Sequence, residues 1–222
     1  VQVDEFSVSE YAFHWELHQN ATMAIVHLQN GADYSVTTAS VDECLLDLGS
    51  SVNVDPSIVK VLEVNDQFYG CGDCPGNDYE RCLTKLSSDD FSILDTLSVS
   101  NFWIPTSVKS DSNGKLWVLC EGGGGPSRII RANKETMSIE WSNNLGNPIL
   151  DYRPVDFEVA ENGNSVFFSS RGSLYKMNIT DTVLPEIPVI QASPGGPGSV
   201  SFMGVDPVNG DLYVVIYDGL SS

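Results

Sequence analysis

The sequence is short of positive charge. It has 11 lysines and arginines against 30 aspartates and glutamates, which gives a formal net charge of −19 over 222 residues. A protein this acidic repels nucleic acid and anionic membrane surfaces, so neither is expected as a partner. An acidic surface of this kind keeps an exported protein soluble, and it also suits cations or a basic partner.

Long apolar runs and helical patterns are missing as well. No stretch reaches the roughly 18 apolar residues of a membrane-spanning helix. No stretch of helical length shows a convincing apolar period of 3.6 residues. With 41% apolar residues the chain is still rich enough for a core, so an all-β fold is expected.

Catalytic signatures are also absent. The sequence has no Gly-x-Ser-x-Gly elbow and no His-Glu-x-x-His motif. Its three histidines are His14, His18 and His27. Residues 11–18 alternate between aromatic or apolar and polar side chains, which predicts a strand, and on a strand His14 and His18 lie too far apart to share one ion. We therefore expect no histidine metal site and favour a protein that is not an enzyme.

What the sequence does contain is a repeated hairpin. Its clearest copy runs from Ile104 to Glu121 and turns at Asn113-Gly114, a dipeptide that tolerates the positive φ angles of a tight hairpin turn. Four glycines, 122–125, then predict a loop. Similar turns occur at Asn65, Asn162 and Asn209, so that the four asparagines are separated by 48, 49 and 47 residues.

This period predicts β-propeller blades, each a four-stranded antiparallel sheet of about 48 residues. Residues 65–222 hold the clear repeats and residues 1–64 a divergent beginning, all within a single domain, 1–222, or a fragment of one. Earlier strands are expected at 34–41 and 58–64, third strands at 82–86, 128–131 and 173–177, and fourth strands at 92–99, 138–143 and 187–192. About four and a half blades do not close a ring, so we expect either further blades in a longer polypeptide or a second chain.

Five cysteines and two sequons point to an oxidising compartment outside the cytoplasm. The disulfide candidates are Cys71, Cys74 and Cys82, with Cys82 bonded to one of the other two. Cys71 and Cys120 are expected to remain unbonded, because facing strands of adjacent blades pack too far apart for a disulfide. Asn20 and Asn178 are the candidate glycosylation sites.

Residues 105–125, followed by residues 128–137, resemble exported β-propellers of Bacteroidetes-type bacteria. The resemblance rests on Asp-Ser-Asn-Gly-Lys-Leu-Trp-Val-Leu-Cys-Glu-Gly-Gly at 111–123 and on residues 205–214, and it covers residues 65–219. These proteins belong to surface-layer-like and quinoprotein-like propeller families. Some of them bind corrinoids beside an outer-membrane transporter, so the resemblance implies a binding protein at the cell surface.

A ligand or partner surface is expected on the loops that join the second strand to the third and one blade to the next. Aromatic residues and arginine are the usual anchors of such surfaces, and both are found there. The candidates are Phe102, Trp103, Tyr152, Arg153, Arg171 and Tyr79.

The sequence thus favours a secreted, non-enzymatic propeller that binds surface proteins, a corrinoid or a glycan. One alternative is a metal-dependent propeller hydrolase of the lactonase type, in which calcium is held by carboxylates of the innermost strands. The residues for that site are Asp156, Glu158 and Asp206. The other alternative is a structural subunit of a surface layer or filament.

Overall fold

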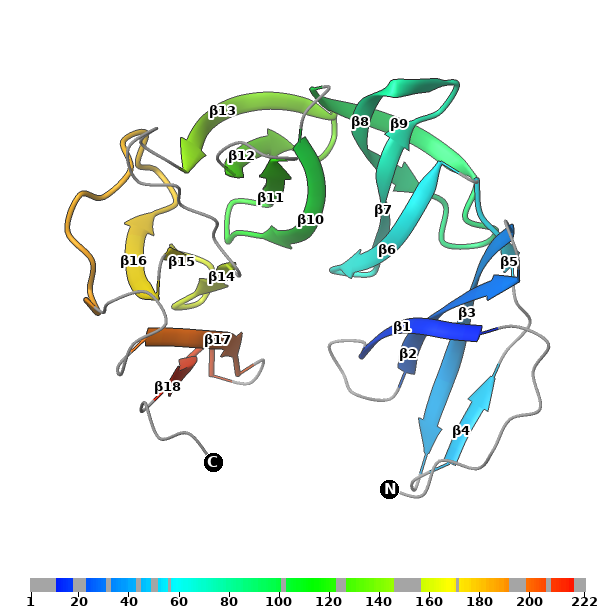
Figure 1. The fold of residues 1–222 in the computed structure, drawn as a ribbon, viewed down its shortest axis with the longest axis horizontal. Coiled ribbons are helices and arrows are strands. Elements are labelled where there is room, and N and C mark those ends of the chain that lie inside the picture. The colour runs from blue at the N-terminus through cyan, green and yellow to red at the C-terminus, as the bar shows by residue number, and fades with distance from the viewer. Residues whose placement is uncertain are drawn as a thin grey trace. The chain divides into compact units, whose positions relative to one another are not determined.

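In the residues that the computed structural model describes, all the regular structure is β-strand (Figure 1). The described residues are 11–17, 23–30, 33–42, 45–48, 52–55, 57–100, 103–122, 127–145, 157–170, 172–191, 199–206 and 209–217. Among them no helix is long and apolar enough to cross a membrane. The chain divides into two compact units, Val1–Asn101 and Phe102–Ser222, which are described separately.

The first unit begins with a five-stranded sheet, the first sheet. Strands β1 to β4 are neighbours in chain order and β5 pairs with β3. The strands expected from the alternation in residues 11–18 and at residues 34–41 are confirmed. The bounds are β1 Tyr11–Leu17, β2 Met23–Asn30, β3 Asp33–Asp42, β4 Leu45–Leu48 and β5 Val52–Asn53.

The second sheet has the four antiparallel strands predicted for a blade. Both residues of its first turn, Asn65 and Asp66, have positive φ angles of 53° and 61°, as a tight hairpin needs. Phe68 packs on Phe91 with ring centroids 5.0 Å apart, so the turn between β8 and β9 is held to the core. The bounds are β6 Ile58–Val64, β7 Gln67–Cys74, β8 Asn77–Leu86 and β9 Ile93–Ser100.

The second unit holds three sheets. The third sheet again has four antiparallel strands, the fourth sheet has three and the fifth sheet has two. The third sheet consists of β10 Trp103–Ser110, β11 Lys115–Gly122, β12 Ser127–Asn133 and β13 Ser138–Leu145. The fourth consists of β14 Phe157–Ala160, β15 Ser165–Ser170 and β16 Ser173–Asn178, and the fifth of β17 Ser199–Val205 and β18 Leu212–Tyr217.

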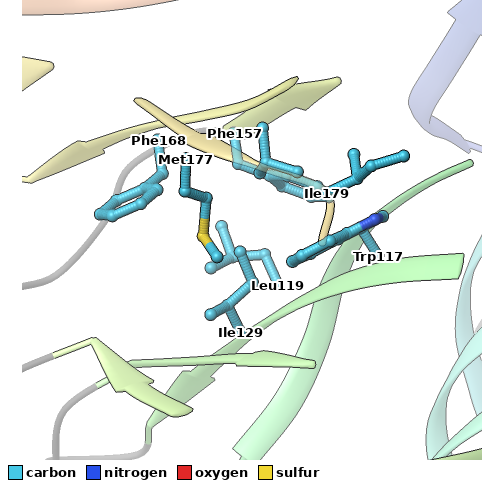
Figure 2. Packing of buried hydrophobic residues seen from close by; sticks show 8 residues of the cluster. Trp117, Leu119, Ile129, Phe157, Phe168, Met177 and Ile179 are labelled. Carbon is cyan, nitrogen blue, oxygen red and sulfur yellow. The ribbon is translucent and has the colours of Figure 1, made fainter. Parts of the chain in front are cut away.

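The third and fourth sheets share one apolar core. Figure 2 shows Trp117, Leu119 and Ile129 of the third sheet facing side chains of the fourth. Burying each large apolar side chain contributes about 1.5–3 kcal/mol, so this contact is a main source of stability in the second unit. The members from the fourth sheet and the segment after it are Phe157, Val166, Phe168, Met177 and Ile179.

The predicted second strands are confirmed. Leu116 and Val118 lie on β11, Val166 and Phe168 on β15, and all four are buried. Leu212 and Val214 lie on the equivalent strand β18 but are half-buried. Four-stranded antiparallel sheets repeated at this period identify the fold as a β-propeller.

One predicted strand is wrong. Residues 187–191 form no strand, and only a single bridge joins Ile190 to Leu174 of β16. Pro185 and Pro188 have no backbone N–H and cannot continue a ladder of hydrogen bonds. The outer edge of the fourth sheet is therefore followed by an irregular segment, while β9 and β13 occupy that place in the second and third sheets.

Candidate functional site

The candidate site lies on the first strands of successive sheets. Within the second unit, β14 contacts both β10 and β17, as the innermost strands of neighbouring blades do. Lys109 of β10 reaches across to Glu158 of β14, and its Nζ lies 3.1 Å from Oε1 of the carboxylate. The Glu158 side chain is only 12% exposed and that of Lys109 is 38% exposed. The pair thus joins a largely buried carboxylate to an ammonium group that solvent can reach.

The blade repeat places these two residues side by side. Lys109 lies four residues before the turn residue Asn113, and Glu158 lies four residues before Asn162. The two residues therefore occupy the same position in consecutive repeats. Because first strands of consecutive blades are neighbours, equivalent side chains at this position can meet.

Two backbone hydrogen bonds hold the strand ends in this arrangement. The N–H of Ser112 donates to the carbonyl of Gly163 at 3.0 Å, and the N–H of Glu161 donates to the carbonyl of Gly210 at 2.9 Å. In both bonds, the donor is the residue just before the turn asparagine of one repeat. The acceptor is the glycine just after the turn asparagine of the following repeat. We call this repeated contact the turn chain. It fixes β10, β14 and the turn after β17 relative to one another.

Glycine is required at both acceptor positions. Gly163 has a φ of +80°, and a Cβ there would lie 2.5 Å from the backbone nitrogen of Ser112. Gly210 has a φ of +74°, and a Cβ there would lie 2.8 Å from Oδ1 of Asn162. The close approach of turn to turn thus depends on the missing side chains.

The turn at Asn113-Gly114, between β10 and β11, differs from the expected hairpin turn with positive φ at both residues. Only Gly114 has a positive φ, while Asn113 does not. The buried carboxylate of Asp111 accepts hydrogen bonds from the N–H groups of Asn113 and Lys115 and from Nε1 of Trp117. A side chain that satisfies three donors makes the wider turn possible and ties it to the core.

Most of the predicted loop surface lies outside the described part of the chain, so it stays a prediction. Phe102, Tyr152, Arg153 and Arg171 lie outside the described residues. Trp103 is the first residue of β10, and nothing is described of its side chain. Tyr79 is 85% exposed on β8, in the first unit.

The cysteine prediction is confirmed. A disulfide joins Cys74 to Cys82, while Cys71 and Cys120 remain buried thiols. Strands β7 and β8 continue as far as a tight turn at Pro75-Gly76, so no long loop separates them. The disulfide therefore clamps the end of a hairpin.

The two candidate glycosylation sites differ in what can be said of them. Asn20 lies outside the described residues. Asn178 is exposed at the end of β16, and its backbone N–H and Nδ2 both donate to Oδ2 of Asp181.

The residues considered for metal binding do not form a metal site in the described part of the chain. There, no group of three or more histidine, cysteine, aspartate or glutamate side chains is placed to hold an ion. His14 and His27 lie on β1 and β2, while His18 and Asp156 lie outside the described residues. Glu158, another of the calcium candidates, faces the ammonium group of Lys109.

Sequence reasoning identified Glu158 but missed Lys109. The signal was present, since the two positions are 49 residues apart and match the spacing of Asn113 and Asn162. A search for opposite charges at equivalent blade positions would have found the pair.

The comparisons with known proteins agree on the fold. No family model and no curated protein matches the chain. A candidate 6-phosphogluconolactonase from Bacteroides uniformis ATCC 8492 matches with a TM-score of 0.57 and 10% identity over 90% of this chain. The Dos1 propeller matches with a TM-score of 0.60 and 11% identity over 95% of this chain. The periplasmic gluconolactonase of Pseudomonas aeruginosa matches with a TM-score of 0.51 and 11% identity, also over 95% of this chain. The chain spans 62%, 56% and 55% of these three chains.

These similarities correct the functional prediction. At such identities they establish the β-propeller fold alone. The expected non-enzymatic extracellular binding module is nevertheless contradicted, because lactonases stand among the matching structures and favour the lactonase alternative.

Proposed function

We propose that this chain belongs to a propeller hydrolase that opens a lactone ring. The observation that carries the proposal is the ion pair between Lys109 and Glu158 on adjacent first strands. A largely buried carboxylate beside a solvent-accessible ammonium group supplies a proton acceptor and a positive charge within one small site. The lactonase names of structures with this fold give the reaction class.

The reaction needs only water and the lactone. Glu158 accepts a proton from a water molecule as its oxygen attacks the ring carbonyl carbon. The ammonium group of Lys109 stabilises the negative charge that develops on the carbonyl oxygen. The ring C–O bond then breaks, the leaving alkoxide takes the proton that Glu158 accepted from water, and the product is an open-chain hydroxy acid.

A calcium ion does not fit the described residues of this site. A calcium ion takes six to eight oxygen ligands. Here the Glu158 carboxylate faces the ammonium nitrogen of Lys109 at 3.1 Å, where a second cation would be repelled. No step of the proposed reaction is therefore assigned to a metal.

The disulfide supports an oxidising compartment for this hydrolase. Cys74 and Cys82 are both buried, and disulfides persist mainly in exported proteins. We therefore keep the proposal that the protein is exported.

The test is hydrolysis of a panel of lactones by the wild-type protein and by Glu158→Gln. General-base catalysis contributes about 10²–10⁴-fold, so Glu158→Gln is expected to lower kcat/KM by at least about 10²-fold. The matched control is Glu140→Gln, which removes the same charge from the ion pair between Lys115 and Glu140 on the third sheet.

Three outcomes decide the proposal. Loss of activity in Glu158→Gln with near-normal activity in Glu140→Gln supports it. Equal activities of the two variants would overturn the assignment of Glu158. Absence of hydrolysis by the wild-type protein on every lactone tested would overturn the reaction class.

A further inference from the structure

The charge of the preferred lactone follows from the basic residues around the site. Of the described lysines and arginines in the second unit, Lys109 is the only one on β10, β14 or β17. Its ammonium nitrogen is already committed, to the Glu158 carboxylate at 3.1 Å and, in the proposed reaction, to the carbonyl oxygen of the lactone. The described parts of β10, β14 and β17 offer no further base for an anionic group of a substrate.

Four other basic side chains of the second unit lie on later strands, where each makes an ion pair or a hydrogen bond. Lys115 on β11 pairs with Glu140, and Lys176 on β16 pairs with Glu161. Two arginines of β12 make hydrogen bonds away from the first strands. Arg131 donates to the carbonyl of Ile179, and Arg128 donates to the hydroxyl of Ser142.

The net charge of the whole chain also disfavours an anionic substrate. A formal charge of −19 repels anions at long range and slows their approach to the protein. A phosphate group carries up to two negative charges near neutral pH and needs several donors or cations at its binding site. On the described first strands of the second unit, Lys109 is the only cation.

We infer that the site takes an uncharged lactone and discriminates against one that carries a phosphate group. This inference rests on the proposed lactone hydrolysis and adds the substrate's charge to it. The structures of the same fold include both a candidate 6-phosphogluconolactonase and a gluconolactonase, so the fold by itself does not decide between the two classes. The scarcity of positive charge on the described first strands of the second unit favours the uncharged one.

The first experiment compares glucono-δ-lactone with its phosphorylated counterpart on the wild-type protein. The value of kcat/KM is expected to be at least about tenfold higher for the uncharged lactone at low salt, because the acidic protein repels the phosphate. The difference is expected to shrink as salt is added, since salt screens that repulsion. A higher kcat/KM for the phosphorylated lactone at low salt would overturn the inference.

The second experiment adds a positive charge beside the pair. Ser107 lies two residues before Lys109 on β10, so the two side chains share a face of the strand. Ser107→Lys is expected to raise kcat/KM for the phosphorylated lactone severalfold relative to the uncharged one. Ser138→Lys, on β13, adds the same charge far from the first strands and is expected to leave the ratio unchanged.

The outcomes separate this inference from the proposal beneath it. If neither lactone is hydrolysed, the reaction class fails. If the phosphorylated lactone is preferred and Arg153→Gln or Arg171→Gln abolishes that preference, the reaction class stands and the charge inference is wrong, because these arginines then supply the anion site.

Discussion

The backbone N–H of Ser112 donates to the carbonyl oxygen of Gly163 across two neighbouring sheets, at 3.0 Å. The same bond recurs one repeat later, from Glu161 to Gly210. The position of Glu158 beside Lys109 therefore depends on backbone contacts between turns as well as on the ion pair itself.

The first prediction concerns Gly163. Gly163→Ala must adopt a left-handed φ and place a Cβ against the nitrogen of Ser112, so we expect a loss of about 2–5 kcal/mol in the free energy of unfolding. Gly114→Ala is the control: its φ is also positive, but its Cβ would meet only Lys134 at ordinary contact distance, 3.6 Å. It is expected to cost about 1–2 kcal/mol. Urea unfolding of both variants checks this, and equal losses would show that the close approach is unimportant.

The second prediction concerns the buried face of β11. Val118 is fully buried, so Val118→Ala is expected to lower the free energy of unfolding by about 1–3 kcal/mol through lost burial and a cavity. Val183 is 75% exposed, and Val183→Ala should change the free energy of unfolding by no more than about 0.5 kcal/mol. A thermal or urea midpoint for each variant is sufficient. Similar values for the two variants would contradict the burial assigned to β11.

The strands could be predicted from the sequence because their signals are local. Asparagine turns followed by alternating apolar residues located β7, β11, β15 and β18, and only the degree of burial of β18 differed. The predicted fourth strand at 187–192 follows from the regular blade period, whereas Pro185 and Pro188 are local signals against it. The Lys109–Glu158 pair requires knowing that first strands are neighbours, which local patterns do not contain.

The third prediction concerns the disulfide. Cys74 and Cys82 are separated by 8 residues, and closing a loop of this size stabilises the folded state by about 2.5 kcal/mol in the chain-entropy model. The free energy of unfolding of the double variant Cys74→Ala/Cys82→Ala is expected to be lower by about the same amount. Peptide mapping without reductant should recover the Cys74–Cys82 crosslink. A Cys71–Cys120 crosslink would contradict the alignment of the repeats.

The fourth prediction concerns pH. The hydrogen bond from Lys176, followed by that from Ser165, holds the pKa of Glu161 below its ordinary value. A carboxyl with a lowered pKa in the folded state stabilises the protein above the pKa of the unfolded chain, and this contribution is lost as the pH falls through the folded-state pKa. Lys176→Met should therefore destabilise the protein more at neutral than at acidic pH.

The size of this pH effect should be small, because the Glu161 side chain is 51% exposed. Lys134→Met, which removes the same charge from the third sheet, is the control. Urea midpoints at neutral and acidic pH test the prediction. An equal loss from Lys176→Met at both pH values would show that the pair is not linked to the titration of Glu161.

The irregular segment after β16 protects the protein from a different hazard. An open strand edge invites pairing with the edge of another molecule, which is a common route to aggregation. Beside β16, Ile190 bridges Leu174, and Pro185 and Pro188 offer no N–H groups to an incoming strand. A segment that fails to form the fourth strand thus makes the edge of the fourth sheet a poor template for growth into a fibril.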